Sequence, residues 1–134
     1  MVDAEVIKEW ISKADEDFEF ALSNLKEGKT FFSQICFHFQ QASEKYLKSF
    51  IIAQELEFRK IHDLPLLLKI CLSKDSSLEE IREDCEYLNP FYVNTRYPAH
   101  WPTNFSSQEA QRAHHCASRI RSIIKEKLRK YSYR

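Results

Sequence analysis

Apolar side chains recur every three or four residues along most of the chain, which is the period of an α-helix buried on one side. Residues 7–25 and 106–131 each carry one apolar stripe opposite a charged face. Residues 31–56 are apolar around most of the helix circumference, with a few polar insertions that include Lys45 and Lys48. We expect this segment either to lie at the centre of the fold or to serve both a core and a subunit interface.

Turn and capping residues divide this pattern into separate helices. Gly28 suits the left-handed backbone position that ends the first helix. The fourth helix is expected to end near Pro90. Capping residues or capping-box pairs mark the starts of the second to fifth helices, in chain order: Thr30, Asp63 with Pro65 in the first turn, Ser76 with Glu79, and Ser106 with Glu109.

Five helices with short connections predict an all-α fold, an antiparallel up-and-down bundle of about five helices, four long and one short. The length of 134 residues suits a single helical domain over 1–134. The chain contains one glycine, which excludes glycine-rich phosphate loops and dinucleotide-binding fingerprints.

Charge is balanced overall but unevenly placed. The chain has 20 basic and 20 acidic residues, yet residues 1–20 carry seven acids and two lysines, and residues 119–134 carry seven basic residues and one acid. Either the two terminal helices lie side by side and neutralise each other, or the basic end binds RNA or an acidic partner.

The cysteines, and the histidines other than His100, indicate no metal site and no cofactor. No two cysteines have C-x-x-C spacing, and each lies in an apolar helical pattern where cysteine acts as a small hydrophobe. We expect His38 to be a satisfied interior or interface residue and His62 to help form a helix start. Without a basic leader or about 20 consecutive apolar residues, we expect a reduced, cytoplasmic protein outside the membrane.

Residues 89–105 break the helical period with three prolines and five aromatic residues. Long irregular segments of compact domains often carry function. Arg96 offers a planar, permanently charged group that suits phosphate, and His100 can exchange protons near neutral pH. They could hold a phosphodiester for acid–base chemistry, or both could be structural. The aromatic residues either stack on bases or seal the segment onto the end of the bundle.

The sequence resembles the HEPN family (higher eukaryotes and prokaryotes nucleotide-binding domain) over nearly its whole length. Four motifs carry the resemblance in their order and spacing: Trp10-Ile11-x-x-Ala14-x-x-Asp17, Phe39-Gln40-Gln41-Ala42-Ser43-Glu44-Lys45-Tyr46-Leu47-Lys48, His62-Asp63-Leu64, and Tyr92-x-x-x-Arg96-Tyr97-Pro98. The family has an all-α bundle that usually forms a homodimer, and many members are encoded beside a minimal nucleotidyltransferase as a toxin–antitoxin pair.

Active members of the family are metal-independent RNases, in which an arginine and a downstream histidine from each subunit meet across the dimer cleft. The resemblance therefore implies that Arg96 binds phosphate and that His100 transfers protons while an RNA 2′-hydroxyl attacks the adjacent phosphate. It also favours a substrate- or nucleotide-binding role for a group of aromatic and basic residues: Tyr92, Tyr97, Trp101, Lys45 and Lys48.

Two other functions stay open besides RNA cleavage. Three residues separate Arg96 from His100, whereas the RNase motif of the family has four to six. The chain could therefore be a non-catalytic module that binds nucleotides or RNA, or a protein that only pairs with its nucleotidyltransferase.

Overall fold

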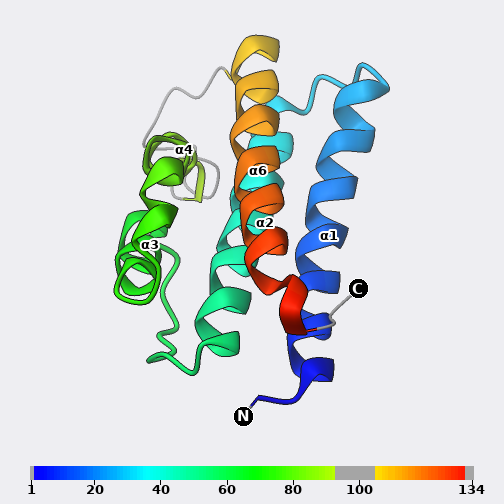
Figure 1. The fold of residues 1–134 in the computed structure, drawn as a ribbon. Coiled ribbons are helices and arrows are strands. Elements are labelled where there is room, and N and C mark those ends of the chain that lie inside the picture. The colour runs from blue at the N-terminus through cyan, green and yellow to red at the C-terminus, as the bar shows by residue number, and fades with distance from the viewer. Residues whose placement is uncertain (1, 93–104, 132–134) are drawn as a thin grey trace.

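A computed structural model describes residues 2–92 and 105–131, and within these ranges the chain forms helices and no strand (Figure 1). The elements in chain order are α1 (Ala4–Lys26), α2 (Phe32–Ala53), α3 (Leu64–Leu72), the 3-10 turn η1 (Ser76–Ile81), α4 (Arg82–Leu88), α6 (Ser107–Leu128) and the 3-10 turn η3 (Arg129–Tyr131). In Figure 1, α1 runs upward, α2 runs down, the short elements from α3 to α4 return, and α6 runs down again. The predicted all-α, up-and-down bundle is confirmed.

Helix α2 lies at the centre of the bundle, between α1, α6 and the pair α3–α4 (Figure 1). Fourteen of its 22 residues are buried, including the aromatic side chains Phe39, Tyr46 and Phe50. Contacts within one chain therefore account for the apolar circumference of this helix, and the expectation of a central position is confirmed.

Helix lengths differ from the expected four long and one short. Helices α1, α2 and α6 have 22 or 23 residues, whereas α3 has nine and α4 seven. The fourth helix is short because residues 76–81 form the 3-10 turn η1 before the α-helix begins at Arg82.

The predicted cap at Ser76 is wrong. The residue before η1 is Asp75, whose carboxylate accepts hydrogen bonds from Ser77 and pairs with Lys127 at 2.9 Å. Glu79 contacts Arg82 and therefore does not complete a capping box with Ser76.

The predicted cap at Thr30 is also wrong, because α2 begins one residue later than expected and Phe31 precedes it without a side-chain cap. Gly28 adopts the expected left-handed conformation with φ 75°. Asp63 caps α3 by accepting from the Leu66 amide at 3.0 Å. Ser106 and Glu109 form both bonds of a capping box at the start of α6.

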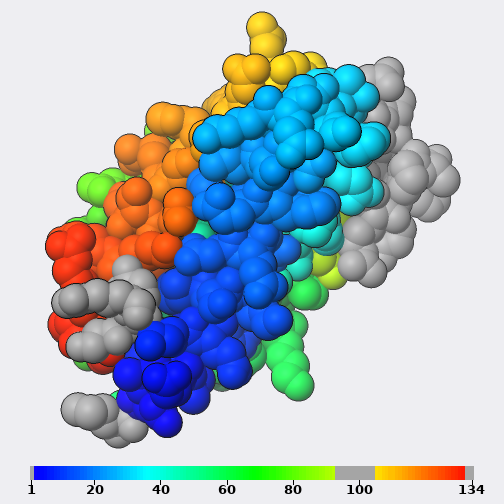
Figure 2. Space-filling view, turned by 90° about the vertical axis from the view of Figure 1, so that its right-hand side faces the viewer, coloured from blue at the N-terminus to red at the C-terminus, as the bar shows by residue number. Residues whose placement is uncertain are grey.

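Ion pairs join the acidic first helix to part of the basic last helix, in line with one of the two expectations. Helices α1 and α6 lie side by side (Figures 1 and 2). Asp15 on α1 accepts from Lys125 at 3.0 Å and lies 3.4 Å from Arg121 of α6. The buried Tyr46 hydroxyl of α2 donates to the same carboxylate, so Asp15 joins three helices.

The four cysteines are buried, in agreement with their expected role as small apolar residues. Burial raises the pKa of Cys36, Cys71 and Cys116 to about 12, and it raises the pKa of Cys85 as well. Thiolate is therefore scarce at neutral pH in these four buried side chains.

The two ends of the irregular segment are anchored at one place. Phe91, just after α4, packs edge-on against Phe105, just before α6, with ring centroids 5.4 Å apart. Phe91 is also buried and packs against Tyr87 of α4. This contact joins the end of the α3–α4 unit to the start of α6.

Candidate functional site

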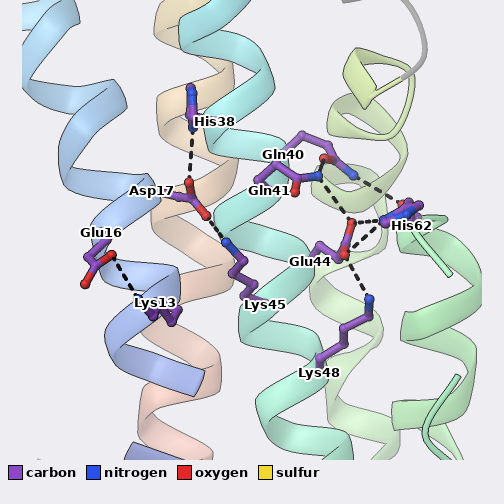
Figure 3. A network of polar contacts seen from close by, with 10 residues as sticks. All are labelled: Lys13, Glu16, Asp17, His38, Gln40, Gln41, Glu44, Lys45, Lys48 and His62. Atoms are coloured by element: carbon purple, nitrogen blue, oxygen red, sulfur yellow. Dashed lines mark hydrogen bonds and ion pairs between the residues drawn. The ribbon is translucent and has the colours of Figure 1, made fainter. Parts of the chain in front are cut away.

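The polar insertions of α2 lie on the side of the helix between α1 and α3–α4, where they form two units of similar composition (Figure 3). In each unit one carboxylate contacts both a lysine and a histidine. Asp17 of α1 pairs with Lys45 and lies 3.1 Å from His38 Nδ1. Glu44 pairs with Lys48 at 2.8 Å and lies 3.0 Å from His62 Nδ1.

Asp17 belongs to the more accessible unit, and its carboxylate is held ionised. Burial by itself would raise the pKa of Asp17, but the hydrogen bonds from His38 and Lys45, together with their charges, outweigh it and lower the pKa below 3.8. The family motifs of α1 and α2 meet at this contact, since Asp17 ends the first motif and Lys45 lies within the second.

Replacing Asp17 by asparagine is expected to destabilise the fold by about 1.5–3 kcal/mol at neutral pH, because hydrogen bonds to a charged group are lost. Asp17 has a lowered pKa in the folded state, so its contribution is complete above the unfolded pKa of 3.8 and is lost as the pH falls below it. Denaturant unfolding of the wild-type protein and of Asp17→Asn should be measured from neutral pH to below the unfolded pKa. The difference in the free energy of unfolding should disappear as the pH falls. A difference that stays constant down to about pH 2 would contradict the assignment.

The Glu44 unit is buried on the α2 side. The side chains of Glu44 and Lys48 are 6% and 7% exposed, so both charges are largely withdrawn from water. Gln41 donates to Gln40, which in turn donates to the His62 carbonyl at 3.2 Å (Figure 3). The polar positions of this helix therefore form a connected network inside the fold.

His62 is the residue of this site that the sequence assigned to a different role. It was expected to help form the start of α3, but that start is capped by Asp63, and the Leu64 amide donates to the Asn89 side chain at 2.9 Å. The imidazole instead faces Glu44 and stacks on Tyr92, with centroids 4.2 Å apart and an interplanar angle of 16°. The one available signal was its place in the His62-Asp63-Leu64 motif.

His38 has a hydrogen-bond partner, as expected for a satisfied residue, but its side chain is only partly buried. It bonds to Asp17, and Phe20 and Phe37 contact its ring with centroids at 4.7 and 5.4 Å.

The structure brings part of the predicted site together. Lys48 and Tyr92 meet at the Glu44–His62 pair, whereas Lys45 belongs to the Asp17 unit. The four other predicted site residues lie outside the described residues: Arg96, Tyr97, His100 and Trp101.

Two hollows adjoin residues of the paired carboxylate units. One, of about 350 Å³, lies between α1 and α2 and is lined by Glu9, Trp10, Lys13 and Lys45. The other, of about 220 Å³, is lined by His62 and its neighbours Asp63, Asn89, Pro90 and Tyr92.

Residues 2–92 and 105–131 contain no group of three or more His, Cys, Asp or Glu side chains arranged to hold a metal ion. In the same part of the chain, no helix combines the length and the apolar character that crossing a bilayer requires.

Comparisons with known proteins agree with this architecture. The chain aligns with a crystal structure of TT1696 from Thermus thermophilus at a TM-score of 0.81 and 27% identity, over 92% of this chain and 99% of that one. It aligns with a crystal structure of ST0689, described as an archaeal HEPN homologue, at a TM-score of 0.74 and 25% identity, over 91% and 97% of the two chains. No curated protein matches the sequence.

The model of the HEPN domain family matches residues 7–128, which include most of α1, the central helix α2, the paired carboxylate units and α6. With this match and a bundle that superimposes on an archaeal HEPN homologue, the chain belongs to the HEPN domain family.

Proposed function

We propose that this HEPN protein is an RNA-cleaving subunit of a toxin–antitoxin pair, that its partner is a minimal nucleotidyltransferase, and that it cleaves RNA without a metal ion. One observation supports a site on the polar face of α2. Tyr92, which opens the motif containing Arg96, stacks on His62 and thereby lies at the buried Glu44–Lys48 pair. Arg96 follows Tyr92 by four residues, and four residues of backbone reach about 14 Å at most.

The proposed chemistry is attack of a 2′-hydroxyl on the neighbouring phosphate. Arg96 binds the phosphate and stabilises the negative charge that develops on its oxygens, while His100 transfers a proton. The products are one RNA end with a 2′,3′-cyclic phosphate and one with a free 5′-hydroxyl.

The described residues suggest how this face would receive RNA. Lys45, 30% exposed and ion-paired with Asp17, borders the hollow that Trp10, Lys13 and Glu9 also line, so an aromatic residue and two lysines lie together there beside one acidic residue. A base on an aromatic ring and phosphates near cations are the usual elements of single-strand binding. Lys48 donates to Glu44, so its role would be to hold the Glu44 carboxylate in place and not to bind RNA directly.

The homodimer is part of the proposal and rests on the family. Within one chain, α2 is already covered on most sides, so the dimer needs a different surface. Sedimentation of the full chain at micromolar concentration should show a dimer, and a monomer would remove the symmetric cleft from the mechanism.

The experiment that tests the proposed function uses the purified protein, end-labelled single-stranded RNA and EDTA. We expect cleavage in EDTA with a cyclic-phosphate terminus, and a loss of about 10²–10³-fold in rate for Arg96→Ala because one group that stabilises the transition-state charge is removed. Binding that weakens with salt but yields no product would favour the non-catalytic module. A stable complex with the nucleotidyltransferase and no RNA binding would favour a purely interacting protein.

A further inference from the structure

We infer that His62 is a further catalytic residue for the proposed RNA cleavage, with Nε2 as the atom that accepts the proton and Glu44 as the residue that positions it. This inference rests on the proposed function and adds to it a general base outside the Arg96–His100 motif.

The hydrogen bonds of His62 determine which nitrogen is available. Its Nδ1 lies 3.0 and 3.1 Å from the two carboxylate oxygens of Glu44. Lys48 donates to the same carboxylate at 2.8 Å, and a carboxylate in an ion pair can only accept hydrogen bonds. In the neutral imidazole the proton therefore lies on Nδ1, and Nε2 carries a lone pair, as in the histidine of a serine-protease triad.

The surroundings of His62 leave this nitrogen accessible. The side chain is 47% exposed, and Nε2 has no hydrogen-bond partner in the described part of the chain. Tyr92 stacks on the ring and fixes its plane. The adjoining hollow of about 220 Å³ is smaller than a pocket that encloses a drug-sized ligand, and it suits one sugar–phosphate unit of a longer strand.

His38 provides an internal comparison. It has the same kind of carboxylate and lysine partners, Asp17 and Lys45. Its ring, however, is 29% exposed and is contacted by both Phe20 and Phe37. The same local chemistry is therefore used for packing at His38, whereas His62 opens onto a hollow.

A second proton-transfer group meets a requirement of the proposed reaction. The 2′-oxygen–phosphorus bond forms on one side of the phosphate while the phosphorus–5′-oxygen bond breaks on the other, so the reaction needs one proton-transfer group at each oxygen. His62 Nε2 accepts the proton of the 2′-hydroxyl, and His100, the proton-transfer residue of the proposed function, acts as the acid that delivers a proton to the 5′-oxygen. Glu44 stabilises the imidazolium that forms.

The test compares steady-state cleavage of single-stranded RNA in EDTA by the wild-type protein and by His62→Gln, Glu44→Gln and His38→Gln. We expect His62→Gln to lower kcat by about 10²-fold with little change in KM, and to remove one ionisation from the pH–rate profile. Glu44→Gln should give a smaller loss and a displaced profile. The charged or titratable groups that face His62 are Glu44 and Lys48 of α2, Asp63 before α3 and Tyr92 after α4.

The matched control is His38→Gln, which should retain wild-type activity. In His62→Ala the space of the ring is vacated beside an open hollow, so added imidazole should restore part of the rate. If His62→Ala is unstable, the pH profile of His62→Gln decides the question, because glutamine can still bond to Glu44.

Two outcomes separate the inference from the proposed function. Cleavage by the wild-type protein together with unchanged kcat and pH profile in His62→Gln overturns the role of His62 and leaves the proposed function standing. A wild-type protein that leaves RNA intact overturns the proposed function, and the role of His62 falls with it.

Discussion

Replacing His100 by alanine is expected to lower the rate of RNA cleavage by about 10²–10⁴-fold, the usual contribution of a positioned acid–base group. The loss should appear in kcat, because in the proposed reaction the imidazole transfers a proton and does not hold the strand. Single-turnover cleavage of labelled RNA with excess protein measures the chemical step directly.

The folded state of His100→Ala should be unchanged. The helices α1, α2 and α6 pack against one another and supply most of the core. None of these helices includes any of residues 93–104. A thermal melt equal to that of the wild-type protein, with cleavage abolished, is the result expected from a catalytic residue. Undiminished cleavage would remove His100 from the mechanism.

Replacing Glu44 by leucine is expected to destabilise the protein by about 3–5 kcal/mol, the cost of leaving one member of a buried ion pair without its partner. Lys48 is 7% exposed, and its ammonium group would lose the carboxylate that neutralises it. His62 would lose its bond to α2 in the same step. Urea denaturation followed by circular dichroism measures the change, with the slope of the transition expected to stay the same.

The double variant Glu44→Leu with Lys48→Met is the control that separates the effect of the unpaired Lys48 charge from the effect of altered packing. Both replacements keep roughly the size of the original side chains, and a buried ion pair exchanged for apolar groups is often neutral in stability. We expect the double variant to recover most of the stability lost in Glu44→Leu. If the two variants were equally unstable, packing rather than an unpaired ammonium would explain the loss.

Much of the fold could be predicted from local signals. Helical periodicity placed the long helices, and the caps at Asp63 and Ser106 form the predicted bonds because a short polar side chain reaches amides only two or three residues ahead. The error at Thr30 arose because α2 begins one residue later than its apolar pattern suggests, after Phe31, which gives no side-chain cap. The error at Ser76 arose because two neighbouring residues could serve as caps. At the second of these, Asp75 has the stronger acceptor and a partner on α6, Lys127, which no local pattern reveals.

The candidate site was less predictable because its contacts join distant parts of the chain. Glu44 and His62 are 18 residues apart, and Asp17 and Lys45 are 28 residues apart. Periodicity marked Glu44, Lys45 and Lys48 as polar positions on an apolar helix. It could not show that two carboxylates each bind a lysine and a histidine, because that depends on how α1 and the segment before α3 are packed against α2.

The contact between Phe91 and Phe105 has a consequence for how such proteins can diverge. Because Phe91 and Phe105 contact each other, residues inserted between these two positions need not displace any of the described helices. Closing a loop of twice the length costs only about 0.6 kcal/mol. Natural selection can therefore alter the spacing of functional groups in this segment almost independently of the scaffold, and relatives with longer or shorter intervals should retain comparable thermal resistance.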